Sequence, residues 1–360
     1  MGKLLLFGVL PMTKCYLDND LNSQGRSDSK CSLSGIDFGS DFQMFIGDTF
    51  VLVYNNEEIY VSAGVHTRNT NYVLELYDTT NAKMKPLVMR RLNVSPRAKP
   101  YQVKISLDDR ILVYGPHGII IFDLNLDKWE VPTNKISQGA KDVWVIGTTV
   151  YYINLKGQLC CIDEEKIDDY ICYDGKVIQN CTKLVGGYEH VCVLTTDGNL
   201  FTYGASTKGQ GGLGYVEIST NTTHKLECFG IVKIKDVVSG GWHTLALSET
   251  NDLYAWGWNE SYQIGIVSPS VVPDPKSINL REYQQKDHPD VVQISAGVRH
   301  SAALDVGGNV WTWGSNRFKQ VTNSDSRKAT PFLLWKKDAN TLIDKIICGR
   351  WCTVIKTANI

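Results

Sequence analysis

The chain has 360 residues, of which 43% are hydrophobic, and its 37 basic and 38 acidic residues leave a net charge of −1. A chain of this length can form two or three ordinary domains or one large closed β-structure, and it is apolar enough to build a substantial core. The balanced charge argues against attraction of the whole molecule to nucleic acids or other polyanions.

The cysteines and the N-terminus bear on where the protein is found. The ten cysteines include no C-x-x-C pair, and several of them lie in strand-like apolar runs, where a free thiol packs as a small hydrophobe. This usage predicts a reducing compartment. The apolar start MGKLLLFGVLPM is too short to cross a membrane, and no small-residue cleavage site follows it. We expect a soluble intracellular chain without a membrane partner.

The first elements in chain order are short apolar runs joined by polar turns. LLLFG at residues 4–8 reads as a strand, and residues 45–64, 104–123 and 142–163 each contain two apolar runs around a turn. Such runs are typical of β-hairpins.

Three much clearer copies of the same pattern follow. GGYEHVCVLTTDGNLFTYG, GGWHTLALSETNDLYAWG and AGVRHSAALDVGGNVWTWG occupy residues 186–204, 240–257 and 296–314. Their histidines are 53 and 57 residues apart, and their closing glycines repeat these spacings. A fixed period of this size indicates one supersecondary unit copied along the chain. Strands that are apolar on successive residues are expected in propeller blades, which are covered on both faces.

The last copy is incomplete at the C-terminus. CGRWCTVI at residues 348–355 repeats AGVRHSAAL, with either Trp351 or Cys352 in place of the histidine. Its second strand is missing, and LLLFG can supply it, because the distance from Gly314 through both termini to Gly8 is 54 residues. We therefore predict an all-β, seven-bladed β-propeller formed by residues 1–360 as one domain, with its ring closed by the N-terminal strand. Its strong repeats span 183–321, and its degenerate blades span 40–170 and 344–360 plus 1–8.

The signature residues are interpreted as structural. The glycines allow close backbone approach or positive φ, the histidines are expected to form hydrogen bonds across blades, and Trp256, Trp311 and Trp313 are expected to pack between blades. Three histidines could hold zinc, but each lies in a different copy, so we predict no metal site. The structural set comprises Gly187, His190, Gly204, Gly241, His243, Gly257, Gly297, His300, Gly314 and Gly349.

No catalytic or cofactor motif is found. The chain lacks a nucleophile elbow, a phosphate loop and a dinucleotide fingerprint, and KGQGGLG at residues 208–214 lacks the GK[ST] ending. We predict no enzyme activity and no cofactor.

Two charged segments are candidate contact surfaces. Residues 83–104 contain seven Lys or Arg and no acid, and Pro96 and Pro100 favour an extended loop. DEEKIDDY at residues 163–170 holds five acids around one lysine. Each is interpreted either as a solvated loop or as a docking segment, the first for acidic surfaces or phosphates and the second for a basic partner.

GGWHTLAL…LYAWGWNESYQIG is similar to the repeat of the regulator of chromosome condensation family, whose fold is a seven-bladed propeller. Compact animal proteins that contain the domain of this family resemble the chain at SETNDLYAWGWNESYQIG and VSPRAKPYQ. This resemblance implies a nuclear, chromosome-associated adaptor that binds a JmjC-domain histone demethylase or hydroxylase, with a cytosolic pool and with histones or the nucleosome as further partners. The expected contact residues are Arg90, Arg91, Ser95, Pro96, Arg97, Trp258, Asn259 and Glu260.

Two other functions remain open. The family archetype is an exchange factor for a small GTPase, but no loop that could act against a nucleotide site is identified. Many relatives are adaptors in ubiquitin or trafficking pathways. Sequence-specific binding to nucleic acid is not expected.

Overall fold

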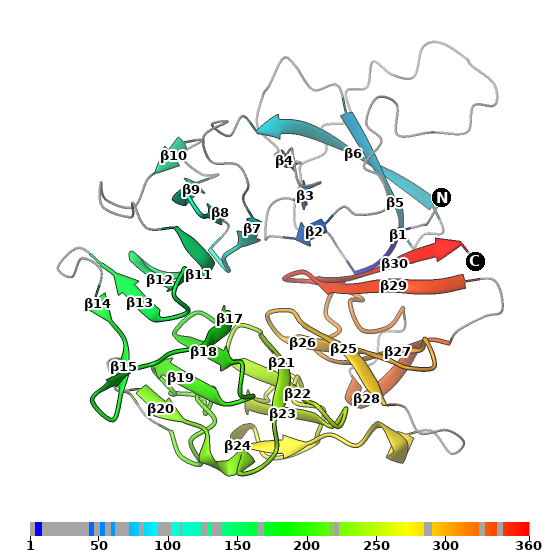
Figure 1. Ribbon diagram of the computed structural model, residues 1–360. Helices are drawn as coiled ribbons and strands as arrows, with labels where there is room; N and C mark the ends of the chain where they lie inside the picture. Colours follow the sequence, from blue (N-terminus) through cyan, green and yellow to red (C-terminus); the bar gives the residue numbers. More distant parts are fainter. Residues whose placement is uncertain are drawn as a thin grey trace.

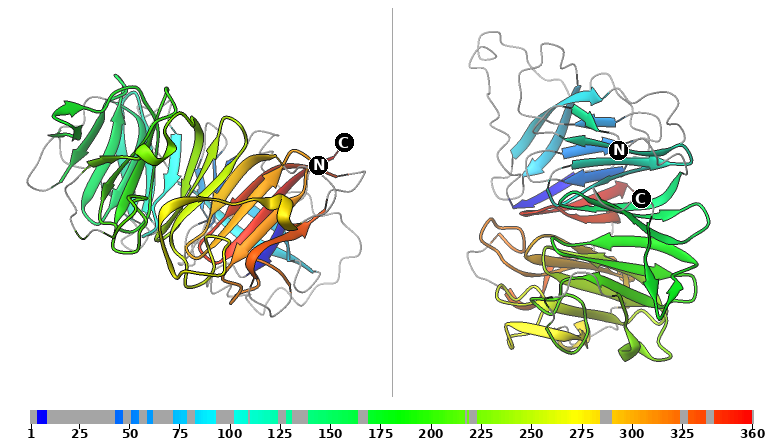
Figure 2. Two further views of the ribbon diagram at one scale, coloured as in Figure 1. Left: turned by 90° about the horizontal axis from the view of Figure 1, so that it is seen from below. Right: turned by 90° about the vertical axis from the view of Figure 1, so that its left-hand side faces the viewer.

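The computed structural model describes residues 4–8, 43–46, 51–54, 59–61, 72–78, 83–92, 102–108, 110–123, 128–130, 139–163, 169–216, 218, 223–283, 290–323, 328–336 and 341–359. These residues are almost entirely β-structure, and the helices among them are two single turns, η3 (Glu227–Phe229) and η4 (Leu280–Tyr283). Figure 1 shows the sheets arranged around a common centre, and Figure 2 shows the same assembly from two further sides. The chain is therefore all-β, as predicted.

Five sheets have four antiparallel strands each, in sequence order from the centre outward, and we call them blades A to E. Blade A holds β7 (Gln102–Ile105), β8 (Arg110–Gly115), β9 (Gly118–Asp123) and β10 (Lys128–Glu130). Blade B holds β11 (Ala140–Ile146), β12 (Thr149–Asn154), β13 (Leu159–Ile162) and β14 (Asp169–Tyr170). Blade C holds β17 (Cys181–Gly186), β18 (His190–Thr195), β19 (Leu200–Gly204) and β20 (Thr223–Lys225). Blade D holds β21 (Ile234–Ser239), β22 (His243–Ser248), β23 (Leu253–Trp258) and β24 (Val271–Ser277), and blade E holds β25 (Val291–Ala296), β26 (His300–Asp305), β27 (Val310–Gly314) and β28 (Lys328–Trp335). A small hairpin, β15 (Cys172–Tyr173) and β16 (Lys176–Val177), lies between blades B and C in the chain.

The remaining strands form one eight-stranded sheet in the order β2-β3-β4-β6-β5-β1-β30-β29. These strands are β1 (Leu4–Gly8), β2 (Gln43–Ile46), β3 (Val51–Tyr54), β4 (Ile59–Val61), β5 (Tyr72–Asp78), β6 (Lys83–Leu92), β29 (Thr341–Cys348) and β30 (Cys352–Asn359). The hairpin of β5 and β6 joins the two halves, because β6 pairs with β4 while β5 pairs with β1. The extended loop predicted from residue 83 onward is thus wrong for Lys83–Leu92, which are strand β6. Their pairing with β5 supplies the backbone partners that a basic loop would lack, and both Pro96 and Pro100 lie outside the described residues.

The two ends of the chain pair with each other. Strand β1 runs antiparallel to β30, with Gly8 opposite Cys352. This is the register of the clear repeats, in which His243 lies opposite Gly257 and His300 lies opposite Gly314. Strand β1 is therefore paired with β30 as the closing strand of a clear repeat is paired with the strand that begins at its histidine, and Cys352 rather than Trp351 lies at the histidine position.

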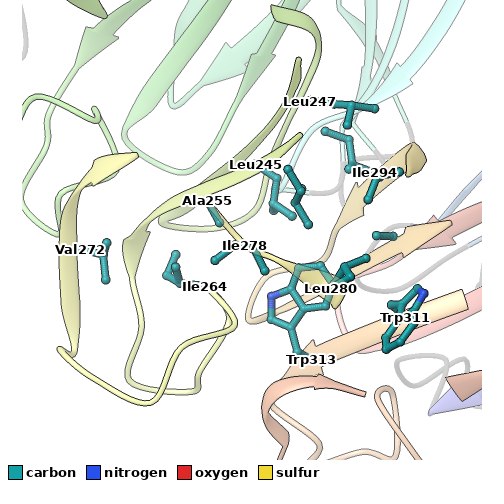
Figure 3. Packing of buried hydrophobic residues seen from close by; sticks show 13 residues of the cluster. Leu245, Leu247, Ala255, Ile264, Val272, Ile278, Leu280, Ile294, Trp311 and Trp313 are labelled. Atoms are coloured by element: carbon teal, nitrogen blue, oxygen red, sulfur yellow. The ribbon is translucent and has the colours of Figure 1, made fainter. Parts of the chain in front are cut away.

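Apolar side chains fill the spaces between neighbouring blades. Figure 3 shows the cluster between blades D and E, where Leu245 and Ile264 of blade D pack with Trp313 of blade E, all of them 0% exposed. Trp256 is equally buried in a cluster that joins blades C and D. Burial of this kind is the main favourable contribution to folding, and it explains why the repeat strands are apolar on both faces.

Candidate functional site

A repeated hydrogen-bonded unit joins each of blades C, D and E, which are the blades of the three clear repeats, to the sheet that follows it in the chain. We call this unit the staple; it consists of a histidine, a Ser or Thr hydroxyl of the next sheet and the backbone oxygen of a glutamine. His243 Nε2 of blade D lies 2.9 Å from Ser301 Oγ of blade E, and that hydroxyl donates to the backbone oxygen of Gln263 at 2.8 Å. His190 makes the same contact with Thr244 Oγ1 at 3.1 Å, and Thr244 donates to the oxygen of Gln210 at 3.4 Å. The inter-blade hydrogen bonds expected of the histidines are thus present.

The third staple reaches the eight-stranded sheet. His300 Nε2 lies 3.1 Å from Thr353 Oγ1, which donates to the oxygen of Gln320 at 2.8 Å. At the next position round, Cys352 replaces the histidine and is 0% exposed. Its backbone oxygen still accepts from Gly349 N at 2.9 Å, the bond that the histidine copies make with their own glycines.

The staple fixes the protonation state of the imidazoles. Because the single hydroxyl proton of Ser301 is donated to Gln263, His243 Nε2 must carry the hydrogen in the bond to Ser301. The Nδ1 atoms of the three histidines are buried and have no hydrogen-bond partner. Burial consequently lowers the pKa of His190 and of His243 to about 3 and that of His300 to about 4. The imidazoles are neutral at physiological pH.

Glycines are required where the histidine rings meet the backbone. A Cβ on Gly240 would lie 2.2 Å from His243 Cε1, and one on Gly297 would lie 2.1 Å from His300 Cε1. Gly187 and Gly240, rather than Gly241, are the equivalents of Gly297. Gly241 instead faces Tyr188 and Val298 of the neighbouring copies, at 3.0 and 3.1 Å from a Cβ built on it.

The closing glycines begin a loop at the same end of every clear blade. Gly257 has a φ of 108°, as its equivalents have 102° and 104°, and a Cβ there would lie 2.5 Å from Trp242 O. The next residue donates its amide to the residue before the histidine: Trp258 N lies 2.8 Å from Trp242 O, and Ser315 N lies 2.8 Å from Arg299 O. The loop between the first and second strands of a blade is therefore hydrogen-bonded to the loop between its third and fourth strands. We call the end of the blades that carries these two loops the loop face.

Aromatic and arginine side chains form a continuous array on the loop face. The guanidinium carbon of Arg299 lies 4.4 Å from the centre of the Trp258 ring. The ring centres of Trp258 and Trp242 are 5.5 Å apart, and those of Trp242 and Tyr188 are 4.6 Å apart. The guanidinium carbon of Arg350 lies 5.8 Å from the centre of the Tyr188 ring. Arg350 also lies 5.8 Å from Trp351, whose ring is 5.2 Å from Phe318, and Arg317 lies 5.5 Å from Phe318. We call these eight residues the belt: Tyr188, Trp242, Trp258, Arg299, Arg317, Phe318, Arg350 and Trp351.

The belt is partly open to solvent, and other loops at the same end of the blades carry exposed apolar side chains. Trp258 is 8% exposed, Arg317 is exposed, and the other six members are half-buried. The third-to-fourth strand loops of blades C and D add Tyr215, Val216, Ile218 and Val267, which are 52, 56, 83 and 66% exposed. Exposed apolar side chains that are adjacent on one loop, as Tyr215 and Val216 are, are typical of interaction surfaces.

The sequence-predicted contact residues fall into three groups. Trp258 belongs to the belt, and Glu260 is exposed beside it. The Asn259 side chain is only 2% exposed and binds its own loop, donating to Pro269 O at 2.8 Å and accepting from Ile264 N at 3.1 Å. Arg90 and Arg91 lie on strand β6, but their side chains are not among those that the structure describes. Ser95, Pro96 and Arg97 lie outside the described residues.

The glutamines of the staple were missed by the sequence analysis. Gln210, Gln263 and Gln320 each follow their histidine by 20 residues, so they repeat with the same 53- and 57-residue spacing. Each is 0% exposed, and the Oε1 of Gln263 accepts from Ser261 N at 2.9 Å, closing the loop that presents its backbone oxygen. Their period in the sequence was sufficient to find them.

Within the described part of the chain, no group of three His, Cys, Asp or Glu is placed to hold a metal ion. No helix there is long and apolar enough to span a membrane.

Comparison with known proteins identifies the repeat. The model of the regulator of chromosome condensation (RCC1) repeat matches residues 181–210, 234–263 and 291–320, and a second RCC1 repeat model matches 251–304. The chain contains RCC1 repeats. Each of the three matches runs from the innermost strand of a blade to the glutamine of its staple, so the staple lies within the RCC1 repeat.

Relatives and solved structures agree with this assignment. The chain is 33% identical over 200 residues to the mouse E3 ubiquitin-protein ligase HERC2, covering 54% of this chain and 4% of the ligase. It is 28% identical over 202 residues to mouse RCC1 domain-containing protein 1, covering 47% of this chain and 53% of that protein. The crystal structure of Prp20p from Saccharomyces cerevisiae superposes with a TM-score of 0.69 at 14% identity, over 100% of this chain and 92% of that one. The chain therefore has the fold of RCC1 propellers.

Proposed function

We propose that this protein is a non-enzymatic interaction scaffold whose principal contact surface is the belt on the loop face. The observation that carries the proposal is the continuous run of aromatic and arginine side chains over blades C, D and E and the β29–β30 loop. Trp, Tyr and Arg are the residues most enriched where protein interfaces concentrate their binding energy. The rigid sheets below hold the belt loops in place, as expected of a scaffold that binds through its loops.

The scaffold is a single seven-bladed ring in this proposal. The eight-stranded sheet then supplies two blades, β29-β30-β1-β5 and β2-β3-β4-β6, in addition to blades A to E. The repeat-like register of β1 on β30 supports closure by the N-terminal strand.

The proposed setting is the nucleus, where the scaffold serves as a chromatin adaptor for a JmjC-domain histone demethylase or hydroxylase. The chain is similar to RCC1 domain-containing protein 1, and the proposed role rests on the resemblance to proteins of this group. Histones are a further proposed partner, because Prp20p, which shares the fold, binds Gsp1p and histones.

A second candidate is an exchange factor for a small GTPase. The specific observation in its favour is again Prp20p, which covers nearly the same length of chain and binds the GTPase Gsp1p. The exposed loop that carries Tyr215, Val216 and Ile218 is the segment we would assign to the GTPase in that case.

The test is capture of partners from nuclear extract by three matched baits. These are the wild type, a belt variant with Arg299→Glu and Arg317→Glu, and a variant with Arg90→Glu, Arg91→Glu and Arg97→Glu. Recovery of a JmjC oxygenase by wild type, and its loss from the belt variant alone, is expected. If the oxygenase is lost only from the variant at Arg90, Arg91 and Arg97, the contact lies on β6 and the residues that follow it instead of on the belt. Recovery of a small GTPase, strongest after EDTA strips its nucleotide, would overturn the adaptor function in favour of exchange.

A further inference from the structure

The three arginines of the belt are held with their guanidinium groups over aromatic rings. Arg299 lies 4.4 Å from the centre of Trp258, Arg317 lies 5.5 Å from Phe318, and Arg350 lies 5.8 Å from both Tyr188 and Trp351. A guanidinium that stacks on a ring keeps the N–H donors at its edge available, and its restricted motion reduces the entropy lost when a ligand binds.

Two of these arginines lack an acidic partner. Among the described residues, Arg299 and Arg317 have no carboxylate within ion-pairing distance, whereas Lys183 pairs with Asp236 at 2.5 Å and Lys356 with Asp344 at 2.8 Å. Glu189 forms no ion pair with either arginine; its Oε2 instead accepts from Thr207 Oγ1 at 3.1 Å and from Gln210 Nε2 at 3.5 Å.

The part of the loop face around the belt carries an excess of positive charge. The described loops of blades C, D and E and the β29–β30 loop contain five cations against two acids, namely Lys208, Arg299, Arg317, Lys319 and Arg350 against Glu189 and Glu260. The described loops of blades A and B at the same end add two acids, Asp108 and Asp163, so the excess is confined to the region of the belt. Positive surfaces of this kind attract carboxylate-rich partners and accelerate their association.

We propose that the belt is a docking site for an extended acidic segment of a partner protein, whose carboxylates bind Arg299 and Arg317. The apolar side chains of the segment lie against Trp351, Phe318 and the exposed Val267 on the neighbouring loop. Arginine forks match carboxylates in paired hydrogen bonds, which gives the site its preference for acids over other polar groups. This inference rests on the proposed function and names the chemical class of the scaffold's partner.

Two other occupants fit less well. Nucleic acid is bound by open aromatic faces on which bases stack, but Trp258 is only 8% exposed and is covered by Arg299. A second copy of the chain would present the same cationic loops, so like charges would meet across the interface.

The test is fluorescence polarisation with a fluorescein-labelled peptide, three repeats of Glu-Glu-Gly-Phe, against the full chain. The variant with Arg299→Gln and Arg317→Gln is expected to bind at least tenfold more weakly. The control with Lys156→Gln and Lys233→Gln removes the same charge from exposed sites at the opposite end of the strands and is expected to bind within twofold of wild type. Replacing both arginines by lysine, which keeps the charge and the fold, is expected to give an intermediate loss because the paired geometry is lost.

Several results would overturn the inference. Equal binding by the glutamine variant, or equal binding of a peptide with Gln in place of Glu, would mean that the belt does not select acids. Stronger binding of a 20-nucleotide single-stranded DNA at the same site would assign the belt to nucleic acid. A dimer seen by sedimentation and abolished by Arg299→Gln and Arg317→Gln would assign it to a second copy.

The two proposals fail separately. Belt-dependent capture from extract without peptide binding would leave the scaffold function standing and refute the acidic segment. Belt-dependent peptide binding without belt-dependent capture would contradict the adaptor function and retain the acid-binding site.

Discussion

The staple histidines predict that acid destabilises this protein by a calculable amount. The folded state keeps His190, His243 and His300 neutral, because burial lowers their pKa values from the ordinary 6.5 to about 3, 3 and 4. The unfolded chain takes up these protons below pH 6.5, so the stabilisation is complete above pH 6.5 and is lost as the pH falls towards the folded-state pKa values.

The magnitude follows from proton linkage. At pH 5.0 each histidine lies about 1.5 pH units below its unfolded pKa, which costs about 2 kcal/mol per histidine and about 6 kcal/mol for the three. A loss of this size is a large part of the stability of an ordinary protein.

The assay is urea unfolding at pH 7.5 and 5.0, followed by tryptophan fluorescence, for wild type and for His243→Gln. The variant should be less stable than wild type at pH 7.5, because Ser301 Oγ loses the imidazole N–H that donates to it. Its further loss on acidification should be smaller than that of wild type by about 2 kcal/mol, because one linked proton is gone. His117→Gln, in the exposed turn between β8 and β9, is the control and should keep the full wild-type loss.

The NMR spectrum of histidine-labelled wild type provides a check that needs no variant. The three buried rings should remain neutral and protonated at Nε2 down to pH 5. A pH 5 loss equal in His243→Gln and wild type, or a buried ring that is protonated at Nδ1, would refute the assignment of the staple.

Three further predictions concern single positions. Gly257→Ala should destabilise by about 3 kcal/mol or more, because it adds a clash with Trp242 O to the strain of its φ of 108°. Gly147→Ala, where φ is 58° and no atom lies within 4 Å of the added Cβ, should cost less in thermal unfolding, because the left-handed region admits other residues and no clash arises. Asn259→Ala should cost about 2–4 kcal/mol in urea unfolding through its buried loop hydrogen bonds, whereas Glu260→Ala should change stability by less than about 0.5 kcal/mol; equal effects would contradict the internal role of Asn259. Leu6→Pro removes an amide from the middle of β1, and hydrogen exchange should speed up along β30 while blade D stays protected.

The sequence was most informative where the repeat is regular. The spacing of His190, His243 and His300 predicted the blades, and the distance through the termini predicted the pairing of β1 with β30. The apolar strands required no further information, because both faces of a blade are buried and the pattern of residues records that burial.

The belt could not be predicted in the same way. Its members come from five different loops and the end of β23, and the positions before the histidine hold Tyr188 and Glu189 in one copy but Val298 and Arg299 in another. Only folding brings Arg350 close to Tyr188, 162 residues away in sequence. The strand at Lys83–Leu92 was missed because prolines and charge argued for a loop, while the pairing of β6 with β5 depends on the hairpin between them.

The staples and the belt are adjacent in the chain, but substitutions in them are expected to have different consequences. Two belt residues are joined directly to buried positions: Trp242 precedes His243, and Trp258 follows Gly257, whose conformation no other residue adopts without strain. A change in His243 or Gly257 therefore disturbs both the packing of two blades and the position of two belt rings. A change in Arg299 or Arg317 alters the charge on the loop face and leaves the staples intact. The surface can consequently acquire a new partner through a few loop residues, while the buried His-hydroxyl-Gln units keep the blades in register.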